Sequence, residues 1–216
     1  MISKNLKLRL YTSSILLFLI MLSIKYSFLL IYILIIFGVF SIIESLSIAE
    51  KLFNKKFYKF LFSVFLILYI FSFCYFFFIF SNFLQLKIIL YCLLIGCVAS
   101  DIGGFIFGKW FKGPKITKIS PNKTYAGVIG SILLTTFVIS IFFITFIGQF
   151  NYKVLILSII TSLGCQLGDL FFSFLKRKAK IKDTGNILPG HGGILDRVDS
   201  ILLGIPFGFF SLGFLF

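Results

Sequence analysis

Residues 57–80 read FYKFLFSVFLILYIFSFCYFFFIF, a run in which Lys59 is the only charged side chain. A helix of this length crosses the roughly 30 Å hydrocarbon core of a bilayer, because each residue adds about 1.5 Å. The whole chain has the same character, since its 216 residues are 59% hydrophobic and 13% charged, with a mean hydropathy of +1.09. A soluble domain is about 25% charged, so the composition excludes a soluble enzyme, a DNA-binding domain and a disordered tail.

We therefore predict an all-α fold, a polytopic integral membrane helix bundle with about seven transmembrane helices surrounded by membrane lipid. Lys4, Lys7 and Arg9 precede the first apolar run, and no small-residue cleavage site follows it, so we expect an uncleaved anchor. The candidate spans are 10–24, 26–43, 57–80, 86–107, 125–147, 153–175 and 198–216.

The basic residues predict the orientation of these spans. With the N-terminus on the cytoplasmic side, 18 of the 21 Lys and Arg residues fall in cytoplasmic segments, and the other three are Lys25, Lys87 and Lys153. Cytoplasmic loops carry an excess of Lys and Arg, so this count favours a cytoplasmic N-terminus. The net charge of +14 then reflects topology, and we expect no nucleic acid partner.

The chain shows no linker, so we predict a single transmembrane domain over residues 1–216. Within it, residues 1–85 carry no recognisable signature, whereas residues 86–216 carry the polar motifs. Cys74, Cys92, Cys97 and Cys165 lie in apolar runs and are expected to be small buried residues. Pairs of glycines at four-residue spacing favour close helix packing and could form a homodimer face; they are Gly104/Gly108, Gly164/Gly168 and Gly204/Gly208.

Two carboxylates lie inside predicted spans. Asp101 and Asp169 each precede the cytoplasmic end of a span by seven residues, or about 10 Å of helix. A carboxylate facing lipid is costly, so we expect both to face a polar cavity or a bound cation, with pairing to a lysine as the alternative. Asp196 and Asp199 open the last span at i, i+3 spacing and should share one helix face. Glu44 and Glu50 are expected to lie in a solvated cytoplasmic segment.

The first polar motif is Ser120-Pro121-Asn122-Lys123-Thr124, directly before the fifth span. Lys123 and Thr124 would lie at a helix N-terminus, where free backbone N–H groups favour an anion. Ordinary helix capping next to a lysine that sets topology is the alternative. Residues 103–109 fit the glycine and lysine spacing of a P-loop, but Trp110 replaces the Ser or Thr that such a loop requires.

The second motif runs from Ser173 to Asp199 and is more specific: S-x-x-K-R-x4-K-D-x-G-x2-L-P-G-H-G-G-x-x-D-R-x-D. It brings basic residues, aspartates, glycines and the only histidine of the chain into one short segment. Carboxylates supply the hard oxygen ligands that Mg²⁺ prefers, and Lys and Arg offset phosphate charge. This combination is typical of a site for a metal-bound polyphosphate.

The second motif resembles the signature of the phosphatidate cytidylyltransferase (CDP-diacylglycerol synthase) family, and the 120–124 stretch resembles that family's other motif. The resemblance implies an integral membrane enzyme that transfers the cytidylyl group of CTP to phosphatidate and releases pyrophosphate. It implies Mg²⁺, with one or two cations held by Asp169 and Asp196 and assisted by Asp199 or Asp183. The family often has Glu where this chain has Ala126 and Phe172.

Roles for the remaining motif residues follow from the same resemblance. We predict a catalytic set that consists of Lys176, Arg177, Lys182, Asp183 and Arg197. The resemblance implies that Lys176 is essential. The predicted substrate contacts are Ser120, Lys123, Thr124, His191, Gly192 and Gly193. For His191, a hydrogen bond that shapes the loop is an equal alternative. Lys178 and Lys180 are expected to serve topology alone.

Two other functions remain open on the sequence. A CTP-dependent lipid kinase of the polyprenol or phytol type would release CDP and a lipid phosphate. A small cation transporter would need charges that thread the bilayer, whereas here they gather at one interface. The expected location is the inner membrane of a bacterium, with the active site facing the cytoplasm.

Overall fold

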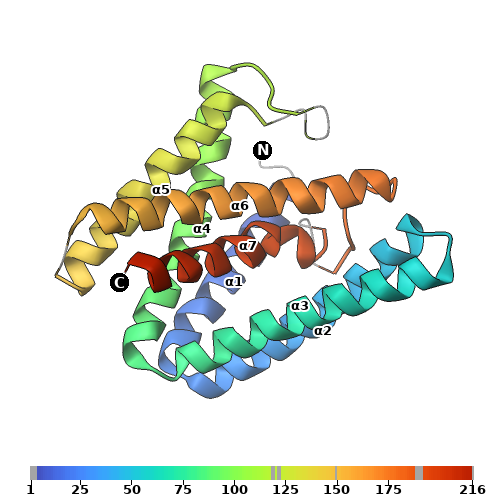
Figure 1. Ribbon diagram of the computed structural model, residues 1–216, viewed down its shortest axis with the longest axis horizontal. Coiled ribbons are helices and arrows are strands. Elements are labelled where there is room, and N and C mark those ends of the chain that lie inside the picture. The colour runs from blue at the N-terminus through green and yellow to red at the C-terminus, as the bar shows by residue number, and fades with distance from the viewer. Residues whose placement is uncertain (1–3, 118–119, 121–122, 149, 188–191, 216) are drawn as a thin grey trace. The chain divides into compact units, whose positions relative to one another are not determined.

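In the part of the chain that it describes, the computed structural model has seven helices (Figure 1). It describes the whole chain except residues 1–3, 118–119, 121–122, 149, 188–191 and 216. The helices are α1 (Lys4–Lys25), α2 (Ser27–Leu52), α3 (Lys56–Ser81), α4 (Leu84–Phe111), α5 (Tyr125–Phe146), α6 (Tyr152–Lys178) and α7 (Leu195–Leu215). Of these described helices, the six from α2 to α7 are long and apolar enough to cross a membrane. The prediction of a polytopic membrane helix bundle is confirmed.

Several helices extend beyond the apolar runs that predicted them. α2 continues nine residues beyond the predicted end at residue 43, and α6 continues past 175 into the basic run. Hydrophobicity marks the part of a helix that lies in hydrocarbon, whereas backbone hydrogen bonding continues until a residue or cap interrupts it. α5 begins where Thr124 caps it, with its side-chain oxygen accepting a hydrogen bond from the Gly127 N–H at 3.1 Å.

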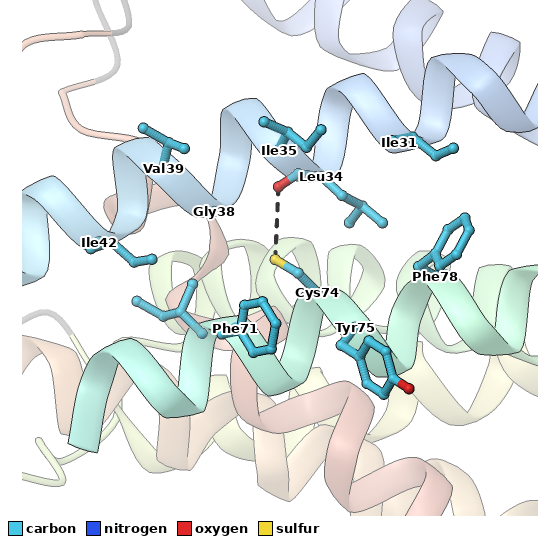
Figure 2. A pocket seen from close by; sticks show the side chains of 11 residues that line it. Ile31, Leu34, Ile35, Gly38, Val39, Ile42, Phe71, Cys74, Tyr75 and Phe78 are labelled. Atoms are coloured by element: carbon cyan, nitrogen blue, oxygen red, sulfur yellow. Dashed lines mark hydrogen bonds between the residues drawn. The ribbon is translucent and has the colours of Figure 1, made fainter. Parts of the chain in front are cut away.

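The chain divides into two compact units, of which unit 1 contains Met1–Phe83 and Leu175–Val198. Its α2 helix packs against α1 and α3. Between α2 and α3 lies an apolar groove of about 340 Å³, lined by residues such as Leu34, Gly38 and Cys74 (Figure 2). The Cys74 thiol donates a weak hydrogen bond to the Leu34 carbonyl oxygen at 3.8 Å.

Unit 2 contains Leu84–Phe174 and Asp199–Phe216 and is held together by small residues. Gly103 of α4 faces the backbone of Gly130 of α5 so closely that a Cβ atom would not fit. Ser131 of α5 donates a hydrogen bond to the Ser100 carbonyl oxygen of α4 at 2.8 Å. Close backbone approach through small residues is how membrane helices pack without a hydrophobic driving force.

The predicted glycine pairs also take part in packing inside unit 2. A Cβ atom on Gly164 would lie 2.8 Å from Phe207, and one on Gly204 would lie 2.7 Å from the Cys97 sulfur. Cys92, Cys97 and Cys165 are buried, and the four cysteines, all within the described residues, are free thiols. The expectation of small buried cysteines is therefore confirmed for these three, while Cys74 is half-buried. The homodimer face stays a prediction.

Candidate active site

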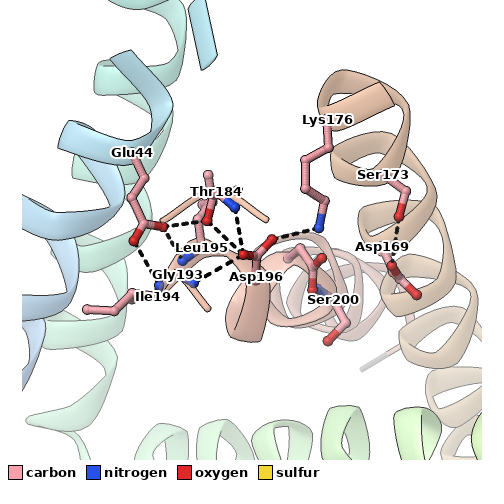
Figure 3. Close-up of polar contacts among 11 residues, drawn as sticks. Glu44, Asp169, Ser173, Lys176, Thr184, Gly193, Ile194, Leu195, Asp196 and Ser200 are labelled. Carbon is pink, nitrogen blue, oxygen red and sulfur yellow. Dashed lines mark hydrogen bonds and ion pairs between the residues drawn. The ribbon is translucent and has the colours of Figure 1, made fainter. Parts of the chain in front are cut away.

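Asp196, in the first turn of α7, has a carboxylate held by donors on both oxygens (Figure 3). Oδ2 accepts hydrogen bonds from the Thr184 N–H at 2.7 Å and the Gly193 N–H at 3.1 Å, and it lies 3.0 Å from the Thr184 hydroxyl oxygen. Oδ1 faces the Lys176 ammonium at 2.8 Å. The Asp196 side chain is 8% exposed, so the surrounding backbone determines its orientation.

Lys176 lies near the end of α6, and its side chain is 12% exposed. Its ion pair with Asp196 is therefore largely removed from water, where a charged pair is screened less than at the surface. Lys178, two residues further on, is exposed, and its ammonium lies over the Phe53 ring at 5.9 Å from the centroid. The two lysines, which the sequence presents as equivalent charges, thus have different surroundings.

Glu44 of α2 joins the same cluster, contrary to the expectation that it lies in a solvated segment. The residue is 3% exposed, and its carboxylate accepts hydrogen bonds from the N–H groups of Ile194 and Leu195 at 3.0 and 2.9 Å. Its Oε2 atom also accepts a hydrogen bond from the Thr184 hydroxyl at 2.7 Å. The prediction was wrong because Thr184 and the start of α7 pack against this part of α2 and bury the carboxylate.

Glu44 belongs to a buried face of α2. Ser41, Ser45 and Ile48 recur at the three- and four-residue spacing of one helix face, and all three are buried. Glu44 lies on the adjacent position of that face. Glu50, in contrast, has a side chain that is 64% exposed and pairs with Lys59 at 2.9 Å, so its predicted solvation is confirmed.

A second charged pair lies in unit 2, between Lys123 and Asp169. The ammonium and the carboxylate Oδ2 atom are 2.6 Å apart, with side chains 20% and 38% exposed. The Ser173 hydroxyl, one turn further along α6, donates a hydrogen bond to Asp169 Oδ1 at 3.3 Å. Backbone hydrogen bonds from Ile116 N–H to the Lys123 carbonyl oxygen and from Tyr125 N–H to the Pro114 carbonyl oxygen hold the segment before α5.

The intramembrane carboxylate Asp101 has a partner that sequence reasoning did not predict. The Ser200 hydroxyl of α7 donates a hydrogen bond to its Oδ2 atom at 2.8 Å. Asp199, the neighbour of Ser200, is 7% exposed, and its Oδ1 atom accepts the Ser200 N–H at 3.0 Å. Its carbonyl oxygen lies against Gly168 of α6, where no Cβ atom would fit. These contacts give Asp199 a buried position in the packing of unit 2.

The other predicted site residues have varied surroundings. Arg177, Lys182, Asp183 and Arg197 are exposed on the segments that flank the Asp196 cluster, which comprises Glu44, Lys176, Thr184, Gly193 and Asp196. Ser120 and Thr124 are half-buried, as is Gly192, whose φ of +85° lies in the region that favours glycine. His191 lies outside the described residues.

The donor chemistry fits a hard divalent cation in part. Asp169 and Asp196 offer carboxylate oxygens, the ligands that Mg²⁺ prefers, and in this structure each has a lysine ammonium beside it. Within the described part of the chain, no group of three or more His, Cys, Asp or Glu side chains is gathered closely enough to hold a metal ion. Asp169 and Asp196 are therefore each a candidate ligand.

Comparison with known proteins decides the family. A family model described as "Cytidylyltransferase family" matches residues 2–215. The chain belongs to this cytidylyltransferase family. The resemblance that rested on two motifs thus extends over nearly the whole chain, including the helices that carry no signature.

Individual relatives of this cytidylyltransferase family member share somewhat less than half of their residues with it over the matched region. A phosphatidate cytidylyltransferase of Rickettsia bellii is 47% identical over 123 residues, covering 52% of this chain and 52% of that protein. Proteins of the same name from Mycobacterium leprae and Helicobacter pylori are 45% and 43% identical, over 52% of this chain and 36% and 42% of theirs. The match thus spans about half or less of these relatives' length.

Proposed function

We propose that the chain transfers the cytidylyl group of CTP to phosphatidate, giving CDP-diacylglycerol and pyrophosphate. The observation that supports this most directly is the largely buried Lys176–Asp196 pair, because both residues belong to the family motif and Asp196 is held by the backbone around it. The shared name of the relatives supports the same substrates.

In the proposed reaction, a phosphate oxygen of phosphatidate attacks the α-phosphorus of CTP. A new P–O bond forms, the bond from the α-phosphorus to the bridging oxygen breaks, and pyrophosphate leaves. Phosphatidate is already ionised at neutral pH, so no general base is needed. Both reactants are anions, and the barrier is therefore lowered chiefly by positioning and by neutralising charge.

The residues of this chain divide that work by their surroundings. Lys176 and Lys123, each of which pairs with a carboxylate, are the residues that we propose to neutralise phosphate oxygens. Arg177, Lys182 and Arg197, which are exposed, are proposed to neutralise the triphosphate, and Asp183 is proposed to assist a cation. Ser120, Thr124, His191, Gly192 and Gly193 are proposed as substrate contacts.

A bound Mg²⁺ would neutralise further charge on the triphosphate. Asp169 and Asp196 are its proposed ligands, and Asp199 is proposed to assist them. The family resemblance also allows a second cation. The proposed location is a bacterial inner membrane, with these residues on the cytoplasmic side where CTP is available.

Purified protein in lipid nanodiscs tests the proposed function. With CTP, Mg²⁺ and phosphatidate, pyrophosphate should be released in step with the formation of CDP-diacylglycerol. Release that does not require phosphatidate, or the release of CDP with a lipid phosphate, would contradict the proposal. The second result would point to a lipid kinase.

The proposed orientation predicts the reactivity of introduced cysteines. Lys115 and Lys180 are exposed and lie in the segments expected on the cytoplasmic side. Lys115→Cys and Lys180→Cys should therefore react with a membrane-impermeant maleimide only when the inner face of vesicles is accessible. Asn82→Cys, at the exposed turn between α3 and α4, is the matched control and should react from outside. Labelling of the Lys115→Cys or Lys180→Cys variant from outside would reverse the topology.

A further inference from the structure

Glu44 is a buried carboxylate for which the proposed reaction has no role. It lies on α2, far along the chain from both motifs, and is 3% exposed. Burying a charged carboxylate is unfavourable unless hydrogen bonds or an opposite charge compensate for it. Within the described residues, its contacts are hydrogen bonds, and no ion pair is among them. Its location therefore calls for a specific explanation.

The donors that reach Glu44 come from one short part of the chain. The N–H groups of Ile194 and Leu195 belong to the start of α7, where backbone donors have no partner within the helix. A negative charge at this end also interacts favourably with the helix dipole. Glu44 thus holds the beginning of α7 against α2 inside unit 1.

Thr184 connects Glu44 to Asp196. Its hydroxyl oxygen lies 2.7 Å from Glu44 Oε2 and 3.0 Å from Asp196 Oδ2, while its N–H donates to the same Asp196 oxygen (Figure 3). A hydroxyl has one proton and donates to one carboxylate at a time. The two carboxylates are thus held on either side of one threonine, and Asp196 in turn contacts Lys176.

Two glycines of the second motif lie close to the Glu44 carboxylate. A Cβ atom on Gly185 or on Gly193 would lie 2.7 Å from Glu44 Oε1. The backbone therefore approaches the carboxylate so closely that Glu44 would have to shift if either glycine carried a Cβ atom. Two glycines of the second motif are thus explained by contact with a residue outside that motif.

From these contacts we propose that Glu44 is a positioning residue for Asp196. By fixing Thr184 and the first turn of α7, it keeps Oδ2 of Asp196 bound to the backbone and leaves Oδ1 directed at Lys176. Groups that orient a ligand or catalytic side chain in this way commonly change activity about 10- to 100-fold when they are altered. The effect on turnover rests on the proposed function, whereas the effect on the start of α7 does not.

Glu44→Gln is the primary test. Glutamine keeps one acceptor oxygen but presents an amide NH₂ group to a donor, so one of the Ile194 and Leu195 contacts is lost. Turnover should fall by about 10- to 100-fold, with the KM for CTP changed by less than about threefold. Glu50→Gln, on the same helix but exposed, is the matched control and should keep turnover within about twofold.

Combining Glu44→Gln with Asp196→Asn separates positioning from a general loss of structure. If Glu44 acts through Asp196, the double variant should be no more than about twofold less active than Asp196→Asn alone, because coupled residues are not additive. Losses that multiply would overturn the proposal, as would folded Glu44→Gln with normal turnover. Should Glu44→Gln not fold, Glu44→Asp, which keeps the charge but is shorter, takes its place under the same criteria.

Hydrogen exchange supplies a readout that does not depend on activity. In Glu44→Gln, at least one of the Ile194 and Leu195 amides should exchange at least about tenfold faster, while those of α4 and α5 are unchanged. Unchanged exchange at Ile194 and Leu195 would overturn the role of Glu44 whatever the activity. If the wild-type protein protects these two amides from exchange but transfers no cytidylyl group, the proposed function is overturned instead.

Discussion

Asp196→Asn should lower the rate of cytidylyl transfer at least about a hundredfold at saturating Mg²⁺. Asparagine can still accept the N–H groups of Thr184 and Gly193 with its one oxygen, so these two residues should keep their contacts with the start of α7. The charge on the side facing Lys176 is lost, and with it the ligand that we propose for a cation. Steady-state kinetics in nanodiscs would measure the change.

Asp169→Asn should have an effect of the same size, because Asp169 is the other carboxylate of the predicted metal site that carries a lysine partner. Glu50→Gln is again the control, since it removes an exposed carboxylate that also pairs with a lysine. Thermal unfolding of each variant would show whether it folds. Near-normal turnover in folded Asp196→Asn or Asp169→Asn would contradict the assignment of that residue.

Lys176→Gln should reduce transfer by about ten- to a thousandfold, whereas Lys178→Gln should leave it within about threefold. The two residues contribute equally to topology, because the positive-inside effect depends on the number of charges near a span. They differ in surroundings, since the Lys176 ammonium faces Asp196 at 2.8 Å and Lys178 lies exposed over Phe53. The kinetics of the two variants therefore separate catalysis from topology.

The comparison needs both variants to insert in the same orientation, which the cysteine-labelling assay on Lys180→Cys can check in each background. Equal losses in the two variants would mean that the basic run acts through its total charge. If neither variant loses activity, the basic side chains that neutralise the phosphates lie elsewhere in the chain.

The membrane fold could be predicted from the sequence because a bilayer leaves few alternatives. A long apolar chain in hydrocarbon must satisfy its backbone hydrogen bonds internally, so apolar runs become helices. The helix ends were less predictable, because α2 and α6 continue after their apolar residues end. Hydrogen bonding and packing maintain the helix there. Glu44, just beyond the apolar run of α2, was therefore expected in a solvated segment, whereas Thr184 and the start of α7 bury it.

The site was predictable where its residues lie within one motif. The resemblance of the second motif to the family signature implied roles for both Lys176 and Asp196, and the structure pairs them. Thr184 was passed over as a variable position between Asp183 and Gly185, although it contacts two carboxylates. A hydroxyl carries no charge pattern, and its role depends on three-dimensional contacts.

Contacts between distant segments also could not be predicted from the sequence. Lys123 and Asp169 were each expected in the site, as substrate contact and metal ligand. Pairing of Asp169 to a lysine was the alternative, but nothing in the spacing indicated Lys123 as that lysine. The same holds for Glu44, whose donors all lie at the other end of the chain. Such pairs depend on how helices pack, which local patterns do not specify.

The most direct measurement follows the phosphorus atoms of CTP. Protein in nanodiscs with phosphatidate and Mg²⁺ would be given CTP labelled with ³²P at the α-position or, separately, at the γ-position. The account predicts that the α-label enters a lipid that migrates as CDP-diacylglycerol, while the γ-label appears in pyrophosphate. A γ-label in lipid with the α-label left in CDP would contradict it, because that outcome is phosphorylation by a kinase.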